Sequence, residues 1–144
     1  QGMDYAALKF VDTKEEGVVL QYVTCEKAEK GKAEKVVKQV AIKTSKQPQP
    51  YTVKYAVDEI PSSRIATQDV WLRVKVHSEG IANQIQAIAE WSYSLDGKKF
   101  IKIGNPFTVR EGKWIGAKLG FFNTRTAKKN DAAFFDIDWI HFEK

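Results

Sequence analysis

The chain has 144 residues, with 23 Lys and Arg against 18 Asp and Glu, and its formal net charge is +5. This length fits one domain that can fold without a disulfide or a metal. The single cysteine, Cys25, excludes an intramolecular disulfide and a cysteine-based zinc site, and no apolar run is long enough to span a membrane. Valine and isoleucine number 24 against 5 leucines. Because β-branched residues favour strands, the composition predicts an all-β domain.

The positive charge comes mainly from lysine, with 19 Lys and only 4 Arg. Proteins that read nucleic acids depend on arginine forks, so we expect no nucleic-acid binding. The densest charge run, residues 25–38, interleaves Glu with Lys and is typical of a solvated loop. Gln1 and Gly2 precede Met3 and resemble a tag remnant, so we expect a single module over residues 3–144.

Strand-like segments in the first half are separated by turn residues. Residues 4–11 and 18–24 flank the polar stretch 12–17, which predicts a hairpin. Residues 36–44 predict another strand, with Val36, Val40 and Ile42 on one face. Residues 51–57 alternate apolar and polar side chains and predict a fourth strand, followed by a long break over residues 58–68.

The second half alternates more regularly. Residues 70–77 predict a strand with Val70, Leu72, Val74 and Val76 inward and with Trp71, Arg73, Lys75 and His77 outward. Residues 85–95 predict the next strand, with Trp91 and Tyr93 on its core face. Asp96-Gly97 then predicts a type I′ hairpin turn, in which both central residues have positive φ. Further strands are expected within residues 100–103, 107–109, 113–123 and 132–143. Nine or ten strands without a helical period predict an antiparallel sandwich.

Three sequence blocks in the second half carry a resemblance to a known family. They are SYSLDGKKF at residues 92–100, GNPFTVREGKWIGAKLGFF at residues 104–122 and DIDWI at residues 136–140. In this order they resemble the C-terminal concanavalin A-like module of family 43 glycoside hydrolases, which are β-xylosidases and α-L-arabinofuranosidases. Residues 4–25 look like the middle of that module. The resemblance implies a two-sheet antiparallel β-sandwich of the jelly-roll type.

The resemblance also implies neighbours that this chain does not show. In the family, further strands usually come before the position of Asp4, and a catalytic five-bladed propeller comes before those strands. We therefore expect either a fragment that lacks its first strands or a short stand-alone relative. Missing strands would leave a sheet edge open, so pairing with another copy in a homo-oligomer is a further expectation.

The function implied by the resemblance is that of a non-catalytic accessory module. In the family, the module packs on the catalytic propeller and helps to shape its substrate pocket, so the expected partner is that domain and the expected ligand a xylan- or arabinan-type glycan. The family's catalytic carboxylates lie in the propeller, and no catalytic residue is expected here. The alternatives are an independent carbohydrate-binding module and a protein-interaction sandwich. We expect no signal peptide on this chain, and a periplasmic or secreted location is slightly favoured.

Three residues are candidates for sugar binding, because flat side chains stack on the C–H faces of sugar rings. Trp71 shares an otherwise polar strand face with Arg73, and Trp114 follows a glycine turn. A tryptophan in such a place is either covered by a loop or exposed for binding. We therefore take Trp71, Trp114 and Arg73 as candidate sugar-binding residues, with burial of each tryptophan as the alternative.

Asp136 and Asp138 lie two residues apart on the last predicted strand and share one of its faces. Carboxyl groups that hydrolyse a glycosidic bond face each other across it, roughly 5–10 Å apart, so this pair is not expected to be catalytic. The two side chains either face solvent or a neighbouring loop, or they bind calcium, which prefers oxygen ligands. We expect no required cofactor, with calcium as the alternative.

Overall fold

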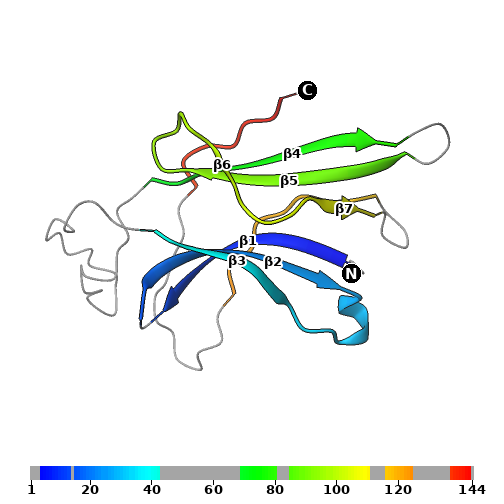
Figure 1. The fold of residues 1–144 in the computed structure, drawn as a ribbon, viewed down its shortest axis with the longest axis horizontal. Helices are drawn as coiled ribbons and strands as arrows, with labels where there is room; N and C mark the ends of the chain where they lie inside the picture. Colours follow the sequence, from blue (N-terminus) through cyan, green and yellow to red (C-terminus); the bar gives the residue numbers. More distant parts are fainter. Residues whose placement is uncertain are drawn as a thin grey trace, which may run out of the picture.

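The computed structural model describes residues 4–13, 15–42, 69–80, 85–110, 116–124 and 137–143. Within these ranges the chain forms two antiparallel sheets, which lie over each other as two layers (Figure 1). The described helical structure is one 3-10 turn, Ala28–Lys30, inside the Glu- and Lys-rich run. No helix in the described ranges is long and apolar enough to cross a membrane. The predicted all-β, two-sheet antiparallel sandwich is confirmed.

The first sheet has the strand order β1 (Asp4–Thr13), β2 (Gly17–Glu26) and β3 (Lys35–Ala41). The strands β1 and β2 form the predicted hairpin, paired along their whole length. Thr13 closes its turn, because the hydroxyl accepts a hydrogen bond from the Glu16 amide at 3.1 Å and donates one to the Gly17 carbonyl at 3.0 Å. A side chain that bonds backbone groups a few residues away is a common way to fix a turn.

The strand β3 contains an irregularity that the sequence pattern did not predict. Its register with β2 shifts between Tyr22 and Val23. Tyr22 pairs with Lys38 and Val23 pairs with Val36, so Val37 has no pairing partner on β2. An extra residue of this kind is a β-bulge, and it moves the side chains that precede it to the other face. Val36 therefore lies opposite Val23, away from Val40, and is 54% exposed. The prediction that Val36 and Val40 share a face was wrong.

The second sheet is built around a central strand, β5 (Gln86–Ser94). The nine-residue strand β4 (Trp71–Glu79) pairs along one edge of β5. Two short strands, β6 (Ile101–Lys102) and β7 (Phe107–Val109), pair along the other edge. An ion pair between Arg110 and Asp4, at 3.4 Å, joins the end of this sheet to the start of the first.

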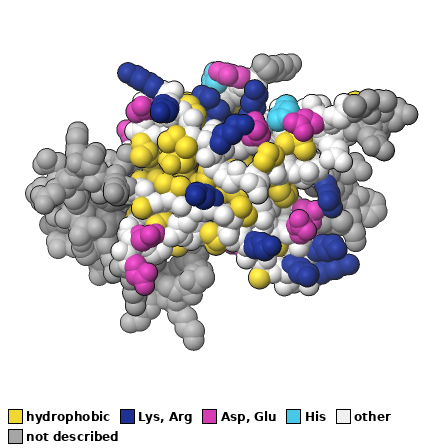
Figure 2. Space-filling model, viewed as in Figure 1, with side chains coloured by type: hydrophobic (Ala, Val, Ile, Leu, Met, Phe, Trp, Pro, Cys, Tyr) yellow, Lys and Arg dark blue, Asp and Glu magenta, His cyan; other side chains and the backbone are white. Residues whose placement is uncertain are grey.

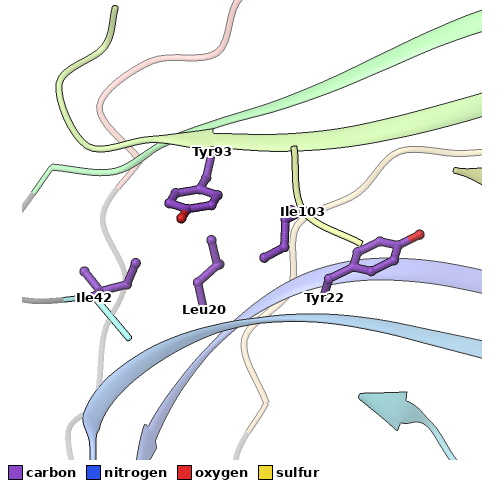
Figure 3. Packing of buried hydrophobic residues seen from close by; sticks show 5 residues of the cluster. All are labelled: Leu20, Tyr22, Ile42, Tyr93 and Ile103. Carbon is purple, nitrogen blue, oxygen red and sulfur yellow. The ribbon is translucent and has the colours of Figure 1, made fainter. Parts of the chain in front are cut away.

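The hydrophobic core lies between the two sheets. Leu20 and Tyr22 point up from β2, and Tyr93 points down from β5 toward them (Figure 3). Ile42 and Ile103 complete the buried cluster, and the side chains packed against it include Trp91. Tyr93 and Trp91 thus face the core, as predicted. Burying large apolar side chains between two layers is the main source of stability in such a fold.

The core is open along the β4 edge. Leu72 and Val76 share the face of β4 that pairs with Tyr93 and Ala89, yet they are 38% and 59% exposed. Because β4 is an outer strand of its sheet, side chains on its inner face are only partly covered. Figure 2 shows hydrophobic side chains gathered between the two layers, with charged groups above and below. Leu72 and Val76 point inward as predicted, but this direction does not bury them fully.

The connection after β5 differs from the predicted type I′ turn. Gly97 has a φ of +69°, but Asp96 is not among the described residues with positive φ. The Asp96 carboxylate instead accepts hydrogen bonds from the backbone amides of Lys98 and Lys99, both at 2.8 Å. An aspartate that bonds amides ahead of it in the chain forms an Asx turn, and in this turn Gly97 has positive φ while Asp96 does not.

Two late segments that were predicted as strands are irregular where they are described. Residues 116–124 and 137–143 have no strand pairing and are exposed throughout. Alternating side chains predict a strand only when a neighbouring strand supplies hydrogen-bond partners. The predicted strand at residues 51–57 lies outside the described residues. The module boundaries 3–144 remain a prediction.

Candidate functional site

The candidate site lies on the outer face of the second sheet. Trp71 and Arg73 are alternate residues of β4, and they pair with Ser94 and Ser92 of β5. The neighbours of those serines on β5, such as Tyr93, face the core, so Trp71 and Arg73 point away from it. Their predicted outward direction is therefore confirmed, while their role in sugar binding remains a prediction.

The Trp71 indole packs against the turn that follows β5. A Cβ atom built on Gly97 would lie 3.0 Å from Cε2 of the indole and 3.1 Å from Cζ2. Only a residue without a side chain lets the turn approach the ring so closely. Trp71 is half-buried as a result. The turn holds part of the ring and leaves the rest accessible, which is intermediate between the two alternatives that the sequence left open.

Arg73 is held by an aromatic ring that the sequence did not single out. Its guanidinium carbon lies 3.5 Å from the centroid of the Phe100 ring, which is a cation–π contact. Phe100 lies just before β6, which pairs with β5 on the edge opposite to β4, so Arg73 reaches across β5 to the ring. We call the surface formed by Trp71, Arg73 and Phe100 the Trp71 platform. Such a surface offers a flat apolar area beside a fixed hydrogen-bond donor.

The turn beneath the platform is fixed by an ionised carboxylate. Hydrogen bonds from the Lys99 and Lys98 amides, and then from the Ser94 hydroxyl, lower the pKa of Asp96 from 3.8 to about 2. The Ser94 hydroxyl is 2.8 Å from the carboxylate. Hydrogen bonds to a charged form favour it. The turn against Trp71 therefore keeps its geometry at neutral and mildly acidic pH.

Charged side chains continue along the same outer face beyond Arg73. His77 lies 2.9 Å from the Glu79 carboxylate, and Lys102 pairs with Glu90. The Lys102 ammonium lowers the pKa of Glu90 because it hydrogen-bonds the charged carboxylate. Both signs of charge are present, so this part of the face presents alternating donors and acceptors.

The remaining predicted site residues are Trp114, Asp136 and Asp138. Trp114 and Asp136 lie outside the described residues. Asp138 is exposed on the segment 137–143. In the part of the chain that the structure describes, no group of three or more His, Cys, Asp or Glu side chains is arranged to hold a metal ion. Calcium binding at Asp136 and Asp138 therefore stays a prediction.

Comparison with known proteins places the chain in one family. The sequence model of the beta-xylosidase C-terminal concanavalin A-like domain matches residues 2–143. A protein of Formosa agariphila named "Beta-xylosidase" is 38% identical over 79 residues, which is 55% of this chain and 12% of that protein. No solved structure matches the chain. Since the family match covers nearly the whole length and agrees with the two-sheet fold, the chain belongs to the beta-xylosidase C-terminal concanavalin A-like domain family.

Proposed function

We propose that the chain is a non-catalytic accessory module of a glycoside hydrolase resembling family 43, and that its partner is the catalytic domain of that enzyme. The observation that carries this proposal is the family match over residues 2–143. It is supported by the Formosa agariphila relative, in which the matching segment makes up 12% of the protein. A module of this kind acts by supporting the catalytic domain and by contacting the glycan substrate.

Sugar contact is the finer part of the proposal, and it rests on the Trp71 platform. Trp71 offers a partly accessible indole face held against Gly97, and Arg73 adds donors fixed over Phe100. Aromatic rings beside a few well-placed polar groups are typical of binding sites for small ligands. Xylan- and arabinan-type chains, which present both C–H faces and hydroxyl groups, fit this combination.

The accessory role is tested by the gene and by activity. We expect the reading frame upstream of Met3 to encode a propeller domain, and we expect the isolated chain not to hydrolyse a nitrophenyl-xyloside. A stop codon directly upstream would contradict the accessory role and favour an independent module. Hydrolysis by the isolated chain, at a rate proportional to its concentration after repurification, would also contradict it.

Sugar contact is tested by isothermal titration calorimetry with xylo- and arabino-oligosaccharides. We expect Trp71→Ala to weaken the binding at this site, and Trp139→Ala to leave it unchanged. Trp139 is a matched control, since it is 60% exposed on the segment 137–143 and belongs to neither strand of the platform. Equal binding by the chain and the Trp71→Ala variant would rule out the platform.

Pairing through a sheet edge is the proposal from a different class of function. Within the described residues, β3 and β4 are the outer strands of their sheets on one side, and β4 carries the exposed apolar residues Leu72 and Val76. Exposed strand edges can pair with another chain. Sedimentation should then show concentration-dependent dimers, whereas a monomer at all concentrations would remove this alternative.

A further inference from the structure

A second polar surface lies on the outer face of the first sheet, on the opposite side of the sandwich from the Trp71 platform. Tyr5, Ala7 and Lys9 are alternate residues of β1 and pair with Cys25, Val23 and Gln21 of β2. The residues between them on β1 and β2 face the core, so these six point outward. Gln39 of β3 pairs with Gln21 and extends this surface across a third strand.

Three side chains converge at one end of this surface. Glu34 accepts a hydrogen bond from the Tyr5 hydroxyl at 2.9 Å and one from the Lys9 ammonium at 2.6 Å. Because Tyr5 and Lys9 flank Ala7 on β1, the contacts to Glu34 pass over Ala7 and its partner Val23. This arrangement agrees with the burial of both, at 8% for Ala7 and 0% for Val23.

A chain of amide contacts fixes the other end of the surface. The Gln21 side-chain amide donates a hydrogen bond to Oε1 of the Gln39 side chain at 2.7 Å. The Nε2 amide of the Gln39 side chain donates one to the Glu16 carboxylate at 2.6 Å. Two long side chains that would otherwise sample many rotamers are therefore held in one arrangement. When polar side chains are already held in place, they lose less conformational entropy as a ligand binds.

These side chains can form more hydrogen bonds than they make with one another. A glutamine amide has two donor hydrogens and a carbonyl with two lone pairs, and a lysine ammonium has three donor hydrogens. Donors and acceptors thus alternate across three strands. Lys9 and Glu34 neutralise each other, and the two glutamines carry no charge, so the centre of the surface complements an uncharged ligand that itself both donates and accepts.

Apolar area and a hollow complete the surface. Val36 lies opposite Val23, on this face, and is 54% exposed because the β-bulge turns it outward. At the Gln39 end, a hollow of about 270 Å³ is lined by Thr13, Glu15, Glu16 and Gln39. Its volume lies just below the roughly 300–1,000 Å³ of pockets that enclose a drug-sized ligand, so it fits one end of a longer ligand.

We propose that this face, formed by Tyr5, Lys9, Gln21, Glu34, Gln39 and Glu16, binds a neutral oligosaccharide. The sugar hydroxyls bond the amides and the Lys9 ammonium, its C–H surface lies against Val36, and one end enters the hollow beside Gln39. Hydroxyl groups are donors and acceptors at once, as this pattern of side chains requires. The site is separate from the Trp71 platform and does not depend on the proposed accessory role.

The test uses isothermal titration of the whole chain with xylohexaose, arabinohexaose and cellohexaose. The Trp71→Ala variant serves as background, so that only the first-sheet face is measured. We expect at least one of these sugars to bind this variant, and we expect added Gln21→Ala and Gln39→Ala substitutions to weaken that binding by at least about tenfold, since they remove several hydrogen bonds to the ligand. Added Gln86→Ala is the matched control, because Gln86 is an exposed glutamine of β5, and we expect no change from it.

A second variant guards against loss of the fold. Tyr5→Phe keeps the ring and removes only the hydroxyl, and it should weaken binding while the thermal unfolding curve still shows a folded protein. The proposal is overturned if none of the three sugars binds the Trp71→Ala chain, or if the added glutamine substitutions leave the affinity unchanged. Binding lost by Trp71→Ala alone would overturn this site and leave the Trp71 platform intact.

Discussion

The phenol ring of Tyr22 lies in the space that any side chain at position 104 would need. A Cβ atom built on Gly104 would overlap the ring carbons of Tyr22, and Gly104 also has a φ of +73°. The Tyr22 hydroxyl donates to the carbonyl of Asn105 at 3.0 Å, so the ring is fixed at both ends. Gly104 follows β6, and this contact therefore joins the two sheets at the core.

Replacing Gly104 by alanine should destabilise the domain strongly. The methyl group collides with a fully buried ring that cannot move without breaking its hydrogen bond, and the backbone has a conformation that L-residues avoid. We expect a loss of about 2–4 kcal/mol in the free energy of unfolding, from overpacking together with backbone strain. Urea denaturation of Gly104→Ala measures this loss.

Gly31→Ala is the matched control for that measurement. Gly31 has a φ of +71°, nearly the same as Gly104, but an added Cβ there meets nothing within 4 Å. Its substitution should cost only the backbone strain, about 1 kcal/mol. Equal losses at the two positions would show that the contact with Tyr22 does not contribute.

Substitution of Leu20 should separate the core from the exposed late segments. Leu20 is fully buried in the cluster between the sheets, whereas Leu119, in the segment 116–124, is 54% exposed. We expect Leu20→Ala to cost about 2–5 kcal/mol and Leu119→Ala less than about 0.5 kcal/mol. Thermal and urea unfolding measure both. A large loss for Leu119→Ala would mean that this segment is packed in the folded protein.

Calcium binding at Asp136 and Asp138 is tested by metal removal. A bound ion stabilises the folded state by mass action, by about 2.7 kcal/mol at one hundred times its dissociation constant. The proposal predicts that EDTA lowers the Tm, that added Ca²⁺ restores it, and that Asp138→Asn abolishes both effects. A Tm that does not respond to EDTA or Ca²⁺ would contradict calcium binding by this chain.

The sequence pattern was sufficient for strands that pair with their neighbours in the chain. The hairpin of β1 and β2 and the outward direction of Trp71 and Arg73 follow from alternation and turn residues. The sequence pattern did not predict which face Val36 lies on, because a β-bulge adds one residue to the register and leaves no mark in an alternating pattern. The pattern also did not predict that residues 137–143 form no strand, since alternation does not reveal whether a partner strand is present.

The two candidate sugar surfaces differ in how much the sequence could reveal. Trp71 could be identified because an aromatic residue stands out on a polar strand face. The surface of the first sheet could not, because Tyr5 and Glu34 are 29 residues apart and Gln21 and Gln39 are 18 apart. Isolated polar residues of this kind are ordinary on any protein surface. Only the strand register shows that they gather on one face.

The Asp96 carboxylate gives the domain a contribution to stability that depends on pH. Backbone amides of Lys99 and Lys98, and then the Ser94 hydroxyl, lower its pKa from 3.8 to about 2. A carboxyl whose pKa is lower in the folded state stabilises the fold fully above its unfolded pKa, and this contribution is lost as the pH falls toward the folded value. The window for Asp96 is therefore about pH 4 down to about pH 2.

We expect the Tm of the unmodified chain to fall more steeply across this window than that of Asp96→Asn, whose side chain does not titrate. Thermal unfolding followed by circular dichroism from pH 5 to pH 2 measures both slopes. Glu34 and Glu90, whose pKa values are also lowered by lysine contacts, titrate in both proteins and cancel in the difference. Ser94→Ala should raise the Asp96 pKa only part of the way back to 3.8, because the two amide donors that contribute most are retained. Parallel curves for the chain and Asp96→Asn would show that the turn beneath Trp71 does not depend on this charge.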